Sequence, residues 1–347
     1  MTVLLTFSIF LVLSWGVSLI AIGRPVRFVF LDREHCEQVK GYAAVAVIWS
    51  HVAAYLGING VEFPSGVGVS IFIILSGFGI EASFQKNKLE GFWKKRLERV
   101  YLPFALCDLL AIIVTKRNVS IYRAVLNFTL IKEIFPFLWF FRFIFVCYLL
   151  FYVVSYIYLY NDKLRRNIWL FVLFFCWFVL KSTLWVDETP FLEPRQIVCF
   201  LLGIILAQNI GKVREYINHH PKKLAGLTMG LTFGGVLIYF AIHIPKFGEL
   251  NSSDLLYNFL ASFTCMPCAL GLLWIIYACR FLQTTAMKYI GLISYEIYIA
   301  QRYFVNRFSV EGSIIGLIRF VFCTSFCAIS LYLLSKQMIR KEKWHFR

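Results

Sequence analysis

The sequence predicts an all-α protein that crosses the membrane many times, and three observations indicate this class. Hydrophobic residues make up 60% of the 347 residues and charged residues only 16%, whereas a soluble domain averages about a quarter charged residues. The mean hydropathy is +0.72. Apolar runs of about 20 residues recur along the chain and are continuous rather than alternating, which favours helices over a membrane barrel.

The apolar runs predict about eleven transmembrane helices in one membrane domain, because no loop between them is long enough for a separate domain. The candidate spans lie at 2–22, 40–58, 66–84, 101–115, 134–160, 167–180, 197–210, 224–244, 255–279, 288–306 and 313–335. Those at 101–115, 167–180 and 197–210 are short for a bilayer. We expect them to be tilted, broken or longer than the pattern indicates.

The basic residues predict an orientation. If the C-terminal tail is cytoplasmic, 24 Lys and Arg fall in inside segments, eight in outside segments and three within spans. This asymmetry follows the positive-inside rule and predicts a multi-pass protein of the cell (cytoplasmic or inner) membrane with a cytoplasmic C-terminus. It also explains the net charge of +16 without a nucleic-acid partner. The 116–133 segment, with four basic residues outside, fits this threading least well.

Several features argue against a cleaved signal peptide, a disulfide framework and a metal site. Residues 1–22 have no basic residue before their apolar run and no clear cleavage site, which indicates a retained helix. The ten cysteines lie mostly within candidate spans, so no disulfide framework is expected. Cys265 and Cys268 have the CxxC spacing, which leaves a redox or metal role open beside simple packing. The histidines show no ligand spacing, and no metal is predicted.

Lys40 and His51 are the most informative pair in the chain. Eleven residues are three helical turns plus about 20°, so the two side chains share one helix face, about 16 Å apart along the axis. This depth places the histidine inside the bilayer, where a titratable group is expensive and indicates function. The histidine can act as a general base or as a nucleophile. A membrane-border anchor for Lys40 and a structural partner for His51 are the alternatives.

Three further segments carry polar or small residues. Arg96 and Arg99 share a face in the first turn of a predicted helix, and two adjacent guanidiniums can clamp a phosphate. The segment that contains Ser76 is rich in glycine, which packing between helices alone would explain. Glu296 and Arg302 lie in or near the membrane, where an ion pair with another helix is as good an explanation as catalysis.

Taken together, these segments resemble acyltransferase family 3, the multi-spanning membrane O-acyltransferases. The resemblance rests on five motifs in order. These are the Lys40-x10-His51 helix with Glu37 ahead of it, Ser76-Gly77-Phe78, Arg96-x-x-Arg99 with Tyr101-x-Pro103, Phe137-Leu-Trp139, and Ile290-Gly291-Leu-Ile-Ser294-Tyr295-x-Ile-Tyr298. Within and beside these motifs, the possible supporting residues are Glu37, Ser76, Trp139, Tyr295 and Glu296.

The chain departs from the family pattern in two places. The family often has a histidine at the end of the late helix, where this chain has Gln301, and this argues against a role for that position. Residues 1–22 form an additional span outside the resemblance. We therefore expect an acyltransferase-3-like membrane domain at 30–340, with ten core spans, preceded by one extra N-terminal helix.

The resemblance implies a donor, an acceptor and a reaction. The donor would be a cytoplasmic acyl-CoA, most simply acetyl-CoA, whose phosphates Arg96 and Arg99 would hold, assisted by Lys40. The acceptor would be a hydroxyl of a surface or lipid-linked glycan, and membrane lipid would surround the site. His51 would activate this hydroxyl or carry the acyl group, with Lys40 as the second catalytic residue.

Two other functions remain open from the sequence. A glycan or lipid transporter would line a path with Arg142, Glu296, Arg302 and Arg319, but no inverted repeat is apparent. A glycan polymerase or ligase would need a large outer loop, which the pattern does not contain. Binding of CoA distinguishes the acyltransferase from the transporter.

Overall fold

A computed structural model gives the structure of the protein, and it confirms the all-α class. Among the described residues there is no strand. The structure describes residue 16 and the ranges 28–55, 62–115, 119–131, 134, 139–159, 163–183, 193–243, 255–308 and 314–345. The predicted helix at 2–22 therefore lies almost entirely outside the described residues.

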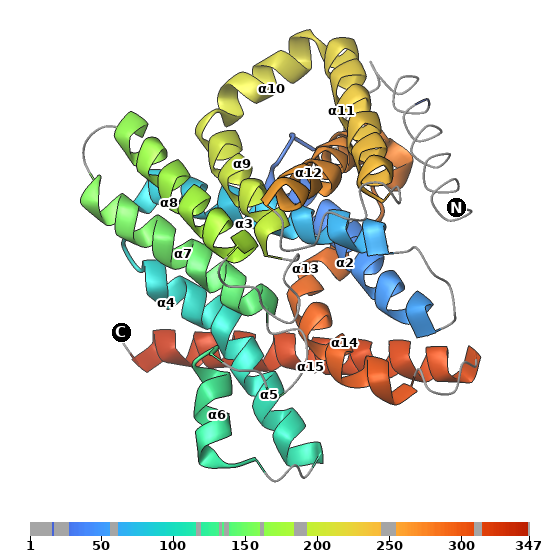
Figure 1. Cartoon of the computed structure of the whole chain (residues 1–347). Helices are drawn as coiled ribbons and strands as arrows, with labels where there is room; N and C mark the ends of the chain where they lie inside the picture. The colour runs from blue at the N-terminus through green and yellow to red at the C-terminus, as the bar shows by residue number, and fades with distance from the viewer. Residues whose placement is uncertain are drawn as a thin grey trace.

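Figure 1 shows how the described helices are arranged. In chain order they are α2 (Arg33–Tyr55), α3 (Glu62–Asn87), α4 (Phe92–Arg96), the π-helical η1 (Leu97–Tyr101), α5 (Leu102–Thr115), α6 (Ile121–Phe128), α7 (Trp139–Ile157), α8 (Lys163–Thr183), the 3-10 turn η2 (Pro194–Gln196), α9 (Ile197–Gln208), α10 (Ile210–His219), α11 (Pro221–Ile242), α12 (Leu255–Ala278), the 3-10 turn η4 (Arg280–Leu282), α13 (Thr285–Leu292), α14 (Ser294–Phe308) and α15 (Ile314–His345).

Five of the described helices are long and apolar enough to cross a membrane, namely α3, α7, α11, α12 and α15. The segment of η2 and α9 forms a sixth candidate together with α10, and the pair is bent by 77°. The short run predicted at 167–180 extends to the 21 residues of α8. These helices make the chain a multi-pass membrane protein, whereas the number of eleven spans stays a prediction.

Close helix contacts explain the glycines of the Ser76 segment. Helix α3 packs against α2, α9 and α12. A Cβ atom on Gly77 would fall 2.2 Å from the carbonyl oxygen of Phe200 in α9, and one on Gly203 would fall 2.1 Å from that of Ile74. Small residues allow two backbones to approach this closely in an apolar environment. The packing explanation of this segment is therefore confirmed.

The predicted span at 288–306 is wrong as one continuous helix, because the chain bends at Ile293 between α13 and α14. Both helices pack against α2. A Cβ atom on Gly291 would fall 1.7 Å from the Glu37 carbonyl oxygen. Gly41 in turn leaves no room for a side chain against α13. These contacts fix α2 and the α13–α14 unit against each other.

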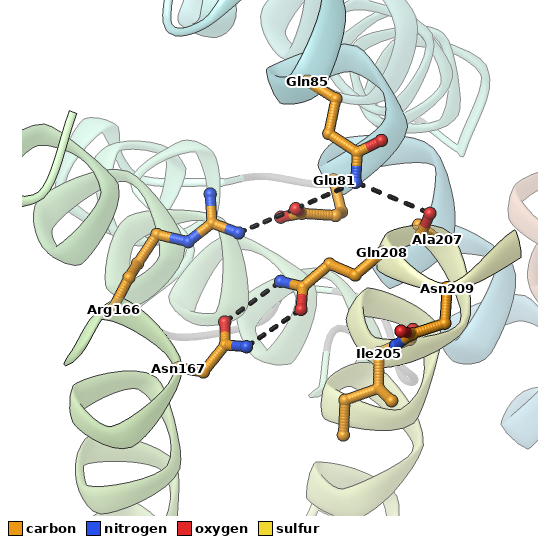
Figure 2. A network of polar contacts seen from close by, with 8 residues as sticks. All are labelled: Glu81, Gln85, Arg166, Asn167, Ile205, Ala207, Gln208 and Asn209. Carbon is orange, nitrogen blue, oxygen red and sulfur yellow. Dashed lines mark hydrogen bonds and ion pairs between the residues drawn. The ribbon is translucent and has the colours of Figure 1, made fainter. Parts of the chain in front are cut away.

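A network of polar side chains joins α3, α8 and α9 (Figure 2). Arg166 Nη2 donates to Glu81 Oε1 at 2.7 Å, and the two side chains are 5% and 1% exposed. Asn167 and Gln208 exchange two amide hydrogen bonds of 2.9 and 3.0 Å. Because a buried charge is costly without a partner, these contacts allow polar groups between apolar helices.

Candidate active site

Helix α2 carries the two residues that define the predicted catalytic face. Lys40 and His51 are both partly buried, and the helix separates them by about 16 Å along its axis. Glu37 lies one turn before Lys40 and forms an ion pair with Arg33, with 2.9 Å between Nε and Oε1. The Arg33 side chain is 87% exposed. Glu37 is therefore engaged at the surface end of the helix.

His51 lies against the late helix. Its Nδ1 atom is 3.3 Å from Oε1 of Gln301 in α14. Gln301 is only 1% exposed, so its amide has little access to water. The position that the sequence argued against is thus a hydrogen-bond partner of the predicted catalytic residue.

Lys40 lies near a carboxyl group of α14, the helix that also carries Gln301. Glu296, in the first turn of α14, is 8% exposed, and its carboxyl lies within electrostatic range of the Lys40 ammonium group. Neither group forms a direct ion pair with a described residue. The adjacent Tyr295 donates its hydroxyl hydrogen to the carbonyl of Val100 in η1. Helix α14 therefore contacts both α2 and the segment with the arginine pair.

The arginine pair lies at a π turn. Arg96 ends α4, donates to the carbonyl of Phe92 at 3.1 Å and lies 4.2 Å from the centroid of the Phe92 ring. Arg99 lies in η1 and is exposed. Burial lowers the pKa of Arg96, and the nearby charge of Arg99 lowers it further. An anion beside both guanidiniums would relieve this repulsion.

The π turn corrects one sequence prediction. We expected Arg96 and Arg99 to share a face in the first turn of one regular helix. Instead the hydrogen bond from Leu102 N–H to Leu97 O closes a wider turn directly after Arg96. Single π turns within α-helices occur frequently at functional sites. The wider turn leaves Arg99 exposed while Arg96 packs on an aromatic ring.

Tyr148 links the Ser76 segment to α7. Its hydroxyl lies 2.9 Å from the hydroxyl of Ser76, and its side chain is 7% exposed. The structure therefore gives Ser76, which the sequence marked as a possible support, a hydrogen-bond partner on another helix.

Trp139 belongs to an aromatic layer beside this group. It begins α7 and lies 6.0 Å, ring centroid to ring centroid, from Phe140. Phe140 in turn lies 5.1 Å from Tyr298 in α14. Trp139 thus supports the packing of α7 against the late helix, and its contacts with the polar residues are indirect.

Arg302 belongs to a buried cluster beside Gln301. It forms an ion pair with Asp108 in α5, and the two side chains are 1% and 0% exposed. The Tyr303 hydroxyl also donates to Asp108. Asn127 Nδ2 donates to Oδ2 of Asp108 at 2.7 Å. The structural explanation of Arg302, an ion pair with another helix, is confirmed. Asp108, an acidic residue in an apolar run, was the sequence signal for this partner.

Two further charges of a transport path lie in separate ion pairs. Arg142 in α7 lies 3.2 Å from Glu193, which also contacts Lys181 at 3.1 Å. Arg302 pairs with Asp108 on another helix. Ion pairs of this kind join neighbouring helices.

The CxxC cysteines lie in helix contacts. Both are free thiols, and Cys268 donates to the carbonyl of Thr232 at 3.5 Å. Cys265 lies against Gly66 of α3. Among the described residues, no group of three or more His, Cys, Asp or Glu is placed to hold a metal ion. These contacts support the packing explanation of the two cysteines.

The fold defines a multi-pass membrane protein. Titratable side chains lie where its helices α2 and α14 meet. A family model described as an acyltransferase domain matches residues 36–335, most of the chain. The chain belongs to acyltransferase family 3 and is an acyltransferase, as the five ordered motifs predicted. Comparison with curated proteins and with solved structures gives no significant match.

Two residues of this region could not be found from the sequence. Tyr148 is one tyrosine in an apolar helix of a chain that is 18% aromatic, and nothing in the pattern distinguishes it. Gln301 was named as a departure from the family pattern, and the sequence argued against a role for it because its partner lies on a helix far away in the sequence. Only the packing of α14 on α2 brings the two together.

Proposed function

We propose that this acyltransferase moves an acetyl group from cytoplasmic acyl-CoA to a hydroxyl of a surface or lipid-linked glycan. The packing of α14 carries the proposal, because this helix contacts both the helix with the histidine and the segment with the arginine pair. Gln301 of α14 lies 3.3 Å from His51, and Tyr295 of α14 donates to the carbonyl of Val100 in η1. A CoA donor needs a phosphate-binding end and a proton-accepting end, and α14 lies beside both.

The proposal includes the arrangement of the chain in the cell membrane. The chain would have about eleven spans, with an acyltransferase domain at 30–340 and an extra helix at 1–22. Its C-terminus would lie in the cytoplasm. The distribution of Lys and Arg supports it through the positive-inside rule. In this arrangement the arginine pair and the first half of α2 are on the cytoplasmic side, where acyl-CoA is available.

The donor would bind through its phosphates. Arg99 is exposed and Arg96 lies on the Phe92 ring, so one guanidinium is open to a ligand and the other is held by an aromatic contact. Charge-assisted hydrogen bonds from two such groups suit a pyrophosphate. Lys40, which has no direct ion pair among the described residues, would add a third positive charge further along α2. The thioester would then extend toward His51.

The reaction would need one proton to move twice. As a general base, His51 would take the proton of the acceptor hydroxyl while its oxygen attacks the thioester carbonyl carbon. The carbon–sulfur bond breaks, the new oxygen ester forms, and the CoA thiolate takes the proton from the imidazolium. A positioned base of this kind contributes about 10²–10⁴-fold to the rate.

A nucleophilic route uses the same atoms in two steps. An imidazole nitrogen of His51 would attack the thioester, CoA would leave as the thiol, and an acyl-imidazole would form. The acceptor hydroxyl would then displace the imidazole. A single turnover without acceptor separates the two routes, because only the nucleophilic route leaves radiolabel on the protein.

The test is transfer of label from radiolabelled acetyl-CoA in membranes that contain native protein, His51→Ala or His243→Ala, matched for expression. His243 is an exposed histidine after α11 and serves as the control. We expect native protein and His243→Ala to label glycan. We expect His51→Ala to lose about 10²–10⁴-fold in rate.

Two outcomes would change the proposal. Full transfer by a folded His51→Ala protein would remove the histidine from the chemistry. Failure of every protein to transfer label or to bind CoA would remove the donor, and a transport function without acyl chemistry would then be tested first.

A further inference from the structure

The contact between His51 and Gln301 has a consequence for the chemistry of the ring. A neutral imidazole carries its hydrogen on one nitrogen only, and the other nitrogen holds the lone pair that accepts a proton. Which nitrogen carries the hydrogen is set by the hydrogen bond that the ring makes. In this protein the amide oxygen of Gln301 faces Nδ1 at 3.3 Å.

An amide oxygen can only accept a hydrogen bond. When it faces Nδ1, the hydrogen of the neutral ring belongs on Nδ1 and the lone pair belongs on Nε2. Glutamine does not titrate, so this influence stays the same at any pH. A histidine in the same place would change its charge within the physiological range.

The late helix holds Gln301 in a fixed orientation. The next residue, Arg302, is rotated by about 100° around α14 and therefore faces a different neighbour. There it pairs with Asp108, and its guanidinium carbon lies 5.5 and 5.6 Å from the ring centroids of Phe104 and Phe141. These contacts resist rotation of α14 about its axis. Rotation would carry the Gln301 amide away from α2.

We propose that Gln301 is a positioning residue that holds His51 as the Nδ1–H tautomer, so that Nε2 is the atom that takes the proton or the acyl group. The inference rests on the proposed function, in which His51 reacts. It gives the glutamine a role in catalysis that the sequence argued against.

The experiment reads the tautomer directly. Full-length protein labelled with ¹⁵N in its histidines is placed in lipid nanodiscs, and the nitrogen shifts are recorded for native protein, Gln301→Met and Gln301→Glu. A His51→Asn sample assigns the signal. We expect Nδ1–H in the native protein and in Gln301→Glu, which keeps an acceptor oxygen. In Gln301→Met we expect the Nε2–H form to increase.

Acyl transfer is measured on the same samples. Loss of one positioning hydrogen bond should lower kcat of Gln301→Met about tenfold, with a smaller change in KM for acetyl-CoA. Gln301→Glu should recover most of the lost rate. Gln283→Met is the matched control, because Gln283 is a buried glutamine whose amide donates to the carbonyls of Ile276 and Tyr277. It should leave the His51 signal unchanged.

The outcomes separate the two proposals. A native His51 signal of the Nε2–H form would overturn the positioning inference, even if Gln301→Met does not fold. So would an unchanged signal and an unchanged kcat in folded Gln301→Met, while His51→Ala remains inactive and the proposed function stands. If the native protein transfers no label, the proposed function fails, and the spectra still decide the tautomer.

Discussion

Two of the polar regions among the described residues differ in whether their charges are available to a ligand: the network of α3, α8 and α9, and the face shared by α2 and α14. In the network of Figure 2, Arg166 and Glu81 are almost fully buried and 2.7 Å apart. On the face shared by α2 and α14, Lys40 and His51 are partly exposed. Lys40 lies near Glu296 without a direct ion pair among the described residues. A buried charge alone therefore does not indicate a reaction site. The proposed site differs from the network because its charge is available to a ligand.

The strongest test of this comparison removes one partner from the paired region. Arg166→Ala leaves the Glu81 carboxylate buried without its partner, and breaking a buried pair in this way costs about 3–5 kcal/mol. We expect a large loss of thermal stability in detergent, with acyl transfer per folded molecule close to native. Unfolding is followed by the temperature dependence of intrinsic fluorescence.

A double substitution is the control for that prediction. Arg166→Met with Glu81→Met removes both charges while keeping similar volumes, and replacement of a whole buried pair by apolar residues is often neutral or stabilising. The double variant should therefore regain most of the stability that Arg166→Ala loses. If the single variant is as stable as native protein, the network does not hold α3 and α8 together.

The second test addresses the arginine pair. Arg96→Ala with Arg99→Ala removes charge-assisted hydrogen bonds of about 1.5–3 kcal/mol each. We expect KM for acyl-CoA to rise about 100-fold, with a smaller loss of stability that comes from the contact of Arg96 with the Phe92 ring. Lys86→Ala with Lys88→Ala removes two exposed charges at the end of α3 and directly after it, and serves as the control. Equal effects of the two double variants would mean that only the net charge of this segment matters.

The sequence predicted the helices better than their interruptions. Continuous apolar runs identify buried helices because every face must be apolar in lipid. The run predicted at 197–210 ended next to the bend at Asn209, whereas the break at Ile293 lies inside one predicted span and has no proline or glycine at that residue. The apolar pattern continues through Ile293, and both helices there pack on α2.

The site was predicted in part for a similar reason. Lys40 and His51 lie on one helix, and helical geometry alone places them on one face. Their partners Glu296 and Gln301 come from α14, and only its contact with α2 selects them. Residue spacing can predict what one helix presents. It cannot predict which side chain of another helix meets it.

A third test examines Lys40 by itself. Lys40→Met keeps the length of the side chain but removes the ammonium group near Glu296, and we expect acyl transfer to fall about tenfold. Lys288→Met is the control, because Lys288 pairs with Glu34 at 2.5 Å and both side chains are 39% exposed. Exposed pairs contribute little, so this variant should behave as native protein. Equal activity of the two variants would reduce Lys40 to a membrane-border anchor.

The smallest expected effect returns to the paired region. Asn167→Ala removes two neutral hydrogen bonds to Gln208 and leaves that amide without them. We expect a loss of about 1–3 kcal/mol, which is smaller than the loss for Arg166→Ala because no charge is left unpaired. Thermal unfolding and acyl transfer are measured together, and only the former should change. A loss as large as that of Arg166→Ala would show that the amide pair, rather than the ion pair, joins α8 to its neighbours.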